Sequence, residues 1–263
     1  MFDTLIFSLI VGAAVGFSAG YLGSIMVLEK MALVGDAMSH VALPGLALGV
    51  LLGFSPQVGG FIFLFVSAIL IWYLGRVTKL SFETLVGAAF TLALAIGILM
   101  YGNNLDELET ALFGDIAKVD LTYAAIAVLI AVTVVFLTRY IHKKIVLGLI
   151  SEELAISKGI NIPQTNLLYL LIVSVTVAVG IQVTGTLLVG FLVVTPAAAA
   201  RIISRNLSRY FVLSAVFGTI SAVSGILLSS ALSTNLPGPL VVISGVVIFA
   251  VVLVVRRAKK IMD

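Results

Sequence analysis

The segment GDAMSHVALPG contains the side chains best suited to chemistry, because Asp36 and His40 lie four residues apart within an apolar stretch. On an α-helix, residues at this spacing share a face, so a carboxylate oxygen and an imidazole nitrogen can reach one cation. Ionisable groups inside a bilayer cost about 2.5–3.5 kcal/mol or more, so such a pair is typical of a transport pathway or a binding site. We therefore expect Asp36 and His40 to bind a metal ion.

A structural role is the alternative for the same pair. Asp36 would then lie at the membrane interface as a helix cap, and His40 would donate a hydrogen bond to a neighbouring helix. Pro44 and Gly45 follow closely, and a proline inside a helix removes a backbone hydrogen bond. We expect the helix to open there, with freed carbonyl groups available to line a passage.

A similar break is predicted at Pro196, in the segment GTLLVGFLVVTPAAAAR. Two interpretations remain open at this point, a thin-walled helix that lines a pore and a closely packed kink. The acidic segment Asp106–Asp115 is also ambiguous. A solvated surface is the default for such a segment, and attraction of cations or binding of a partner is the alternative.

A short polar helix is predicted over Ser151–Asn161, with the sequence SEELAISKGIN. Ser151 can cap its N-terminus, and Glu152 and Glu153 suit the positive end of the helix dipole. Gly159 can end the helix. A helix of this kind either lies on the membrane surface or docks a partner protein, and composition does not separate the two.

Membrane-spanning helices must position these residues. The chain is 61% hydrophobic and 10% charged, whereas a soluble domain has about 45–50% apolar and about 25% charged residues. Uncharged stretches near the length of about 20 residues that a spanning helix needs recur along the whole chain. This pattern excludes a soluble enzyme with one membrane anchor. We expect an all-α, polytopic integral membrane bundle that forms one domain over residues 1–263.

Breaks at charges, Pro and Gly divide the sequence into about nine candidate spans. These are Thr4–Leu28, Lys30–Gly53, Val58–Gly75, Thr84–Tyr101, Leu121–Leu137, Gln164–Ile181, Gly185–Arg201, Tyr210–Leu232 and Pro239–Val255. An eight-span arrangement with one short re-entrant segment is the alternative.

The basic residues predict the orientation, because cytoplasmic loops carry an excess of Lys and Arg. One set of alternate loops holds 14 of the chain's 15 basic residues: Lys30, Arg76, Lys79, Arg139, Lys143, Lys144, Lys158, Arg201, Arg205, Arg209, Arg256, Arg257, Lys259 and Lys260. We therefore expect an outside N-terminus and a cytoplasmic C-terminus. Since these charges are spread over several loops, we expect contact with membrane lipid and none with nucleic acid.

Two absences limit the chemistry. The chain has no cysteine, so Cys-ligated metal sites are excluded, and it has no Gly-Lys dipeptide, so it lacks a phosphate-binding P-loop. We expect no enzyme activity and no covalently bound cofactor on this chain. A pump built on it needs its ATPase on another subunit. A secondary transporter, in which Asp36 and His40 relay protons, is the alternative.

Five segments carry a resemblance to a known family. They are GDAMSHVALPG, LFGDIAKVD, SEELAISKGIN, VAVGIQVTGTLLVGFLVVTPAAAAR and NLPGP, in this order over essentially the whole chain. With these segments the chain resembles the permease subunits of zinc/manganese-type ABC importers. The resemblance implies ATP-driven import of a divalent metal ion as substrate, zinc or manganese with iron as a third candidate, across the cell membrane of a prokaryote.

The resemblance also implies partners and roles. It implies a homodimer with the pathway between the two copies, two cytoplasmic ATP-binding subunits and an extracytoplasmic metal-binding protein. Asp36 and His40 would contact the metal, and the breaks at Pro44 and Pro196 would line the pathway. The coupling helix for the ATPase would include Ser151, Glu152, Glu153, Leu154, Ala155 and Gly159. Two copies could offer two oxygens and two nitrogens, a set that suits Zn²⁺ and, with added water, Mn²⁺ or Fe²⁺, so the ligands do not select the metal.

Overall fold

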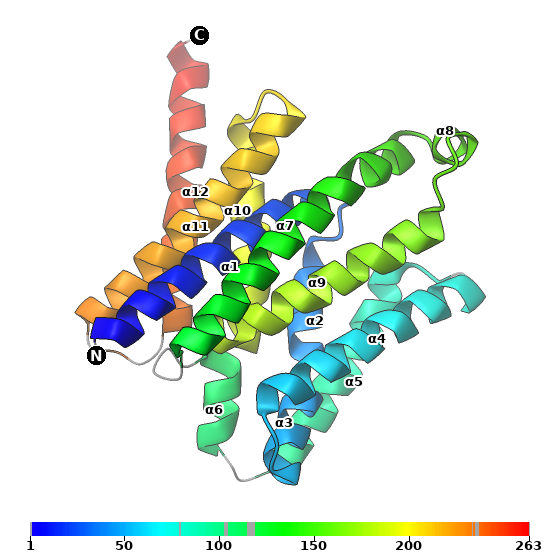
Figure 1. Ribbon diagram of the computed structural model, residues 1–263. Helices are drawn as coiled ribbons and strands as arrows, with labels where there is room; N and C mark the ends of the chain where they lie inside the picture. Colours follow the sequence, from blue (N-terminus) through cyan, green and yellow to red (C-terminus); the bar gives the residue numbers. More distant parts are fainter. Residues whose placement is uncertain are drawn as a thin grey trace.

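The computed structural model describes residues 2–78, 80–102, 105–114, 119–232, 234 and 237–262, and nearly all of them are helical (Figure 1). The helices are α1 (Phe2–Leu28), α2 (Ala32–Val41), α3 (Leu43–Leu52), α4 (Pro56–Thr78), α5 (Phe82–Tyr101), α6 (Leu105–Phe113), α7 (Leu121–Ile150), α8 (Glu152–Ser157), α9 (Ile162–Thr184), α10 (Thr186–Ile203), α11 (Leu207–Ala231) and α12 (Pro237–Met262). The all-α prediction is confirmed.

Eight helical stretches in the described part of the chain are long and apolar enough to cross a membrane. One of them, Val34–Leu52, consists of α2 and α3 together. Helix α10 is shorter, with 18 residues from Thr186 to Ile203. At about 1.5 Å per residue it rises about 27 Å, slightly less than the hydrocarbon thickness of about 30 Å. The structure therefore has eight long spans and one shorter apolar helix where the sequence predicts nine similar spans.

Two predicted boundaries were wrong by more than a few residues. The helix predicted to end at Leu137 is α7, which continues to Ile150 and includes the first part of the predicted loop. With 30 residues α7 is about 45 Å long, so one end extends beyond the hydrocarbon core. The last helix, predicted to end at Val255, continues to Met262. Charged residues mark where a helix leaves the bilayer, but they do not end it, because Lys and Arg are good helix formers.

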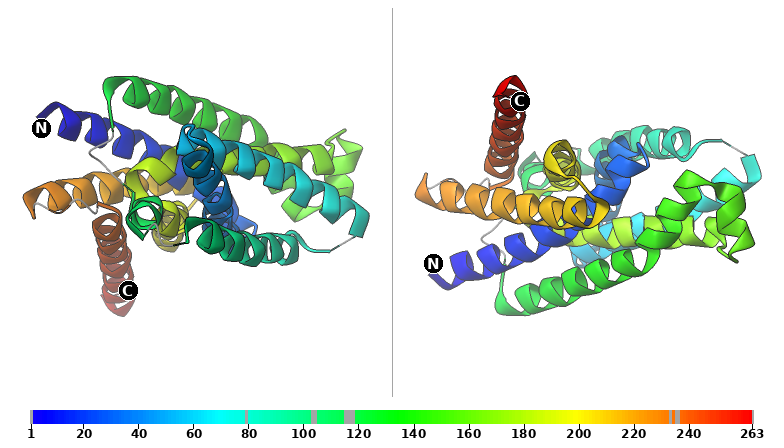
Figure 2. Two further views of the ribbon diagram at one scale, coloured as in Figure 1. Left: turned by 90° about the horizontal axis from the view of Figure 1, so that it is seen from below. Right: turned by 90° about the horizontal axis from the view of Figure 1, so that it is seen from above.

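Helix α1 lies between α7 and α11 in the centre of the bundle (Figures 1 and 2). Gly16 of α1 and Gly218 of α11 face each other so closely that a Cβ on either would collide with the carbonyl group of the other. One turn along, Gly20 is equally close to the backbone of Ser214. Small residues allow helix backbones to approach each other in lipid, where van der Waals packing drives association. The glycines of the first span therefore act in packing.

Hydrogen bonds join further helices across the bundle. The hydroxyl of Tyr210 in α11 donates to the carbonyl oxygen of Ser24 in α1, at 3.1 Å. The Oγ of Ser174 in α9 lies 3.3 Å from the carbonyl oxygen of Leu64 in α4. These bonds satisfy buried polar groups that cannot reach water.

The bundle has two distinct ends. Figure 1 shows the N-terminus, α6, the end of α11 and the start of α12 at the lower end. The C-terminus, α8 and the turn between α10 and α11 lie at the upper end. The basic residues beside α8, between α10 and α11, and near the C-terminus therefore lie away from the acidic segment of α6.

Candidate metal-transport site

Asp36 and His40 both lie in α2, as the sequence predicts. Helix α2 ends at Val41 and α3 begins at Leu43, and the residue between them, Ala42, has φ −70° and ψ −24°. The interruption is therefore limited to one residue whose own backbone is helical. It occurs two residues before Pro44, which lies in the first turn of α3. The N–H groups of a first turn have no partner within the helix, so the N–H that proline lacks costs no hydrogen bond there.

Glycine contacts hold the segment around Asp36 in place. A Cβ on Gly190 of α10 would lie 2.7 Å from the backbone nitrogen of Asp36 and 2.9 Å from its Cβ. On the same helix, Val193 contacts Gly35 of α2 and lies against the backbone at Gly23 of α1. Helix α2 is thus held against α1 and α10 at the turn that carries the carboxylate. Asp36 itself is partly exposed.

His40 is buried, with 6% of its surface exposed. Its ring packs edge-on against Phe90 of α5, with the ring centroids 5.2 Å apart. Its Nδ1 has no hydrogen-bond partner among the described residues. A buried polar atom without a partner is uncommon in a native structure and calls for an explanation such as a ligand or water.

The structural alternative for this pair receives little support from the geometry. Asp36 does not cap α2, because the N-cap is Met31 and no side chain bonds to the free N–H groups there. His40 Nδ1 makes no hydrogen bond to a neighbouring helix in the described part of the chain. Within the same part, no group of three or more His, Asp or Glu side chains converges. A full set of metal ligands therefore needs water, a second copy of the chain, or both.

Pro196 does not break its helix, so this sequence-based expectation was wrong. Helix α10 runs from Thr186 to Ile203 without interruption, with Pro196 in its interior. A proline costs a helix about 3 kcal/mol, and packing around α10 offsets this cost. Pro196 is buried, as are Ala197 and Ala200, which agrees with the closely packed interpretation. Pro44 is buried as well, and its nitrogen lies near Gly97 of α5.

The predicted short helix is α8, and its ends are built as the sequence predicts. The Ser151 side chain accepts a hydrogen bond from the Leu154 N–H at 3.2 Å. Gly159, with φ +74°, ends the helix. The Ile160 N–H donates to the Ala155 carbonyl oxygen and the Gly159 N–H to that of Ile156, which is a Schellman motif.

The outer surface of α8 is both charged and apolar. Glu152 and Glu153 are exposed in its first turn, and Leu154 and Ile156 are exposed beside them. Ala155 is fully buried and anchors the helix to the bundle. Figure 1 shows α8 at one end of the bundle, beyond α7 and α9.

A partly buried carboxylate, Glu29, lines a cavity beside α8, and sequence reasoning missed it. A cavity of about 290 Å³ is lined by Glu29, Lys144, Glu152 and Asn166, among others. Burial raises the pKa of the Glu29 carboxyl from 4.5 to about 7. In the sequence Glu29 stands beside Lys30 as an ordinary pair of loop charges, and no pattern there indicates burial.

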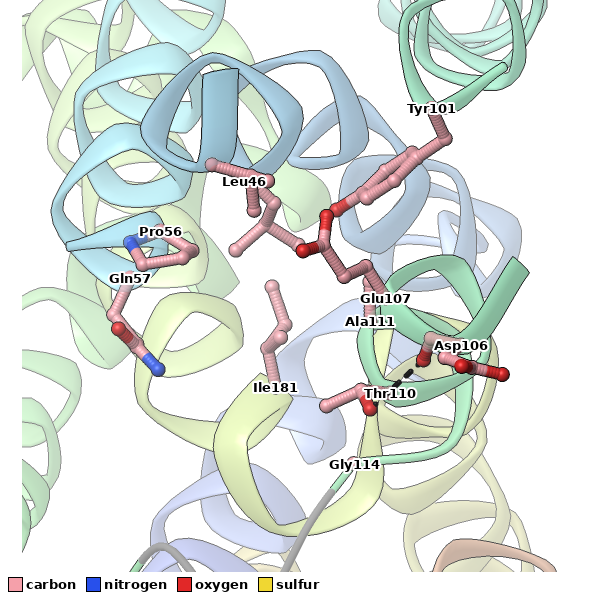
Figure 3. A pocket seen from close by; sticks show the side chains of 11 residues that line it. Leu46, Pro56, Gln57, Tyr101, Asp106, Glu107, Thr110, Ala111, Gly114 and Ile181 are labelled. Carbon is pink, nitrogen blue, oxygen red and sulfur yellow. Dashed lines mark hydrogen bonds between the residues drawn. The ribbon is translucent and has the colours of Figure 1, made fainter. Parts of the chain in front are cut away.

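A second cavity, of about 390 Å³, opens at the opposite end of the bundle, beside α6 (Figure 3). Its apolar walls include Leu46 of α3 and Ile181 of α9. Its polar groups are Gln57, Tyr101, Asp106, Glu107 and Thr110. The acidic segment was noted in the sequence, but its helix and its cavity were not predicted.

Comparison with known proteins identifies the family. Residues 1–256 match the model of the ABC 3 transport family. The chain belongs to this family. It is the membrane permease of an ATP-driven ABC import system in bacteria, and ATP hydrolysis is not its own activity. Membership favours this function over a proton-driven secondary transporter.

Individual ABC 3 relatives cover nearly the whole chain. A manganese transport system membrane protein, MntC, of Listeria monocytogenes is 27% identical over 92% of this chain and 87% of its own length. The high-affinity zinc uptake system membrane protein ZnuB of Haemophilus influenzae is 30% identical over 98% of this chain and 99% of its own length.

Among solved structures, PsaBC from Streptococcus pneumoniae in complex with a Fab has a chain that superposes with a TM-score of 0.84. It is 27% identical, and the match covers 99% of this chain and 95% of that one. An inward-facing putative metal-chelate type ABC transporter superposes with a TM-score of 0.72 at 18% identity, over 98% of this chain and 85% of that one, and shares the fold.

Proposed function

We propose that this permease transports a divalent metal ion, manganese or zinc, and that Asp36 and His40 contact the ion on its way. The two relatives described above are named as a manganese transport protein and a zinc uptake protein. The observation that carries the proposal is the pair itself, an acid and an imidazole one turn apart on α2, with a buried His40 nitrogen that has no partner among the residues the structure describes. Carboxylate and imidazole together suit Zn²⁺, Mn²⁺ and Fe²⁺.

The proposed working unit is a homodimer, with residues 1–263 of each copy forming one transmembrane domain. One protomer supplies only two ligands at Asp36 and His40, and a twofold axis would double this number. Two ATP-binding subunits would lie at the cytoplasmic end and a metal-binding protein at the outer end. Pro44 in α3 and Pro196 within the continuous helix α10 would lie beside the pathway.

The proposed orientation places the upper end of the bundle in Figure 1 in the cytoplasm. The N-terminus is then outside and the C-terminus inside, in agreement with the positive-inside rule. Helix α8 would dock the ATPase through Leu154, Ile156 and its two carboxylates. Exposed apolar side chains next to charges on a rigid, capped helix are suited to such a contact.

Transport measurements on two variants test the role of Asp36 and His40. Asp36→Asn keeps the shape and removes the charge, and His40→Ala removes the nitrogen donor. Each is expected to lower metal uptake about tenfold or more, because ligand loss weakens both binding and transfer. The double variant should be little worse than either single variant, since both disable one step.

The assay uses the whole importer, with its ATPase and binding protein, and follows uptake of Mn²⁺ and of Zn²⁺. Gel filtration and basal ATPase activity report whether each variant is folded and assembled. Wild-type uptake by both well-folded single variants would return Asp36 and His40 to a structural role.

A further inference from the structure

We propose that the cavity beside α6 is a second cation site, in which Glu107 and Tyr101 hold a divalent ion that keeps most of its water, before it reaches Asp36 and His40. The inference rests on the proposed function, which places α6 on the outer side of the membrane. The cavity of about 390 Å³ has room for an ion with its hydration shell.

The first observation is that polar side chains from three helices line one cavity. Glu107 and Thr110 lie on α6, Tyr101 is the last residue of α5, and Gln57 is near the start of α4. In Figure 3 the Glu107 carboxylate points into the cavity, whereas Asp106 points away from its centre. Glu107 and Tyr101 offer oxygen ligands, whereas Gln57 Oε1 accepts a hydrogen bond from Ser55 and the Thr110 hydroxyl donates one to the Asp106 carbonyl oxygen. An oxygen-only set favours a hard ion such as Mn²⁺ over Zn²⁺.

The second observation is independent of the acidic residues. Tyr101 is 4% exposed, yet its hydroxyl makes no hydrogen bond to another residue drawn in Figure 3. The hydroxyl points into the cavity toward the Glu107 carboxylate, which is close enough to interact with it electrostatically. A tyrosine buried in a packed structure usually finds a partner for its hydroxyl. Here the cavity provides the space in which a hydrated cation would supply that partner.

The position of the cavity suits a site that holds the ion before it reaches Asp36 and His40. Leu46 in its wall lies six residues after His40 along α2 and α3, which corresponds to about 9 Å along a helix. The apolar side chains of Leu46, Val50 and Ile181 form its inner wall. An ion held by one carboxylate and water can leave readily, because a weakly held ion retains its shell. The site would collect ions at the outer mouth.

Mn²⁺ binding in a variant background tests the site directly. The assembled importer carries Asp36→Asn and His40→Ala and is placed in nanodiscs of uncharged phosphatidylcholine. Bound Mn²⁺ is measured from the loss of the free-ion electron paramagnetic resonance signal. Mn²⁺ binding should persist in this background, and Glu107→Gln should weaken it about tenfold, because it removes the carboxylate that points into the cavity in Figure 3.

Glu109→Gln is the matched control, since Glu109 lies on the same helix, is exposed and does not line the cavity. It should leave the affinity within about twofold, as expected for an exposed charge outside the site. Equal affinities of the Glu107 and Glu109 variants, or no Mn²⁺ binding in the background variant, would overturn the proposal.

Two conservative variants separate a lost ligand from a misfolded cavity. Glu107→Asp keeps the carboxylate and should retain binding, and Tyr101→Phe should lower the affinity about threefold, the value of one hydrogen bond. An unchanged Mn²⁺ affinity in Tyr101→Phe would show that the Tyr101 hydroxyl does not contribute to the site. Metal uptake by the background variant tests the proposed transport role of Asp36 and His40 separately. Normal uptake would contradict that role without bearing on Mn²⁺ binding beside α6.

Discussion

At the scale of residues, neighbours from distant parts of the chain decide what each ionisable group can do. Asp36 and His40 share a helix face because they are four residues apart, but Gly190 and Phe90 determine the space around them. A larger residue at Gly190 would collide with the backbone at Asp36. Glu29 is the clearest case, because burial alone raises its pKa to about 7.

This pKa predicts a pH-dependent stability. Between pH 4.5 and about 7 the folded protein holds a proton on Glu29 that the unfolded chain releases. Stability from this residue is therefore present below pH 4.5 and is lost as the pH rises through about 7. Glu29→Gln does not titrate, so its melting temperature relative to the wild type should rise between pH 5 and pH 8.

Thermal unfolding of the detergent-solubilised protein at both pH values measures this difference. Glu153→Gln, which neutralises an exposed carboxylate on α8, is the control and should show no comparable trend. An offset between Glu29→Gln and the wild type that is the same at both pH values would contradict a buried, titrating Glu29.

At the scale of elements, local signals are reliable where a helix begins. Ser151, Asp120, Asn161 and Asn206 each accept a bond from the N–H three residues later and so begin α8, α7, α9 and α11. A cap satisfies N–H groups that the helix itself leaves free. These bonds form within four residues, so the short helix at α8 could be predicted.

Charge reversal on α8 tests its proposed contact with the ATPase. Glu152→Lys together with Glu153→Lys places two positive charges where the helix dipole is also positive. We expect less association with the ATPase and lower transport-coupled ATP hydrolysis, with membrane insertion unchanged. ATP hydrolysis by the assembled importer, with and without metal and binding protein, is the measurement.

Glu83→Lys is the matched control, because Glu83 is an exposed acid in the first turn of α5. Its reversal should affect coupling much less than the double reversal on α8. Normal coupled transport in the double variant would count strongly against a docking role for these carboxylates.

At the scale of the whole molecule, the two ends differ in charge and the middle is apolar. Exposed side chains such as Leu129 in α7, Phe61 in α4 and Val254 in α12 face outward from the bundle. Exposed apolar surface of this extent indicates contact with lipid or with another copy. We therefore expect the basic end and the acidic end to lie on opposite sides of the bilayer.

Cysteine labelling tests the orientation, and the absence of native cysteine makes each label unambiguous. A cysteine at Lys143 should react with a membrane-impermeant maleimide only from the cytoplasm, and one at Asp106 only from outside. A cysteine at Leu129, in the apolar first half of α7, is the control and should react poorly from either side. Labelling of the cysteines at positions 143 and 106 from the same side of the membrane would refute the orientation.

The sequence alone determined the membrane class, the family and the residues at i and i+4 on α2, because hydropathy, motif order and helical spacing are local properties. It also determined the caps of α8 for the same reason. The tertiary structure decided three features: the continuity of α10 through Pro196, the partial burial of Glu29, and the proximity of the Glu107 carboxylate to the Tyr101 hydroxyl. Each depends on helices that are distant in sequence, and a buried carboxylate and a solvated one look the same until packing removes the water from one of them.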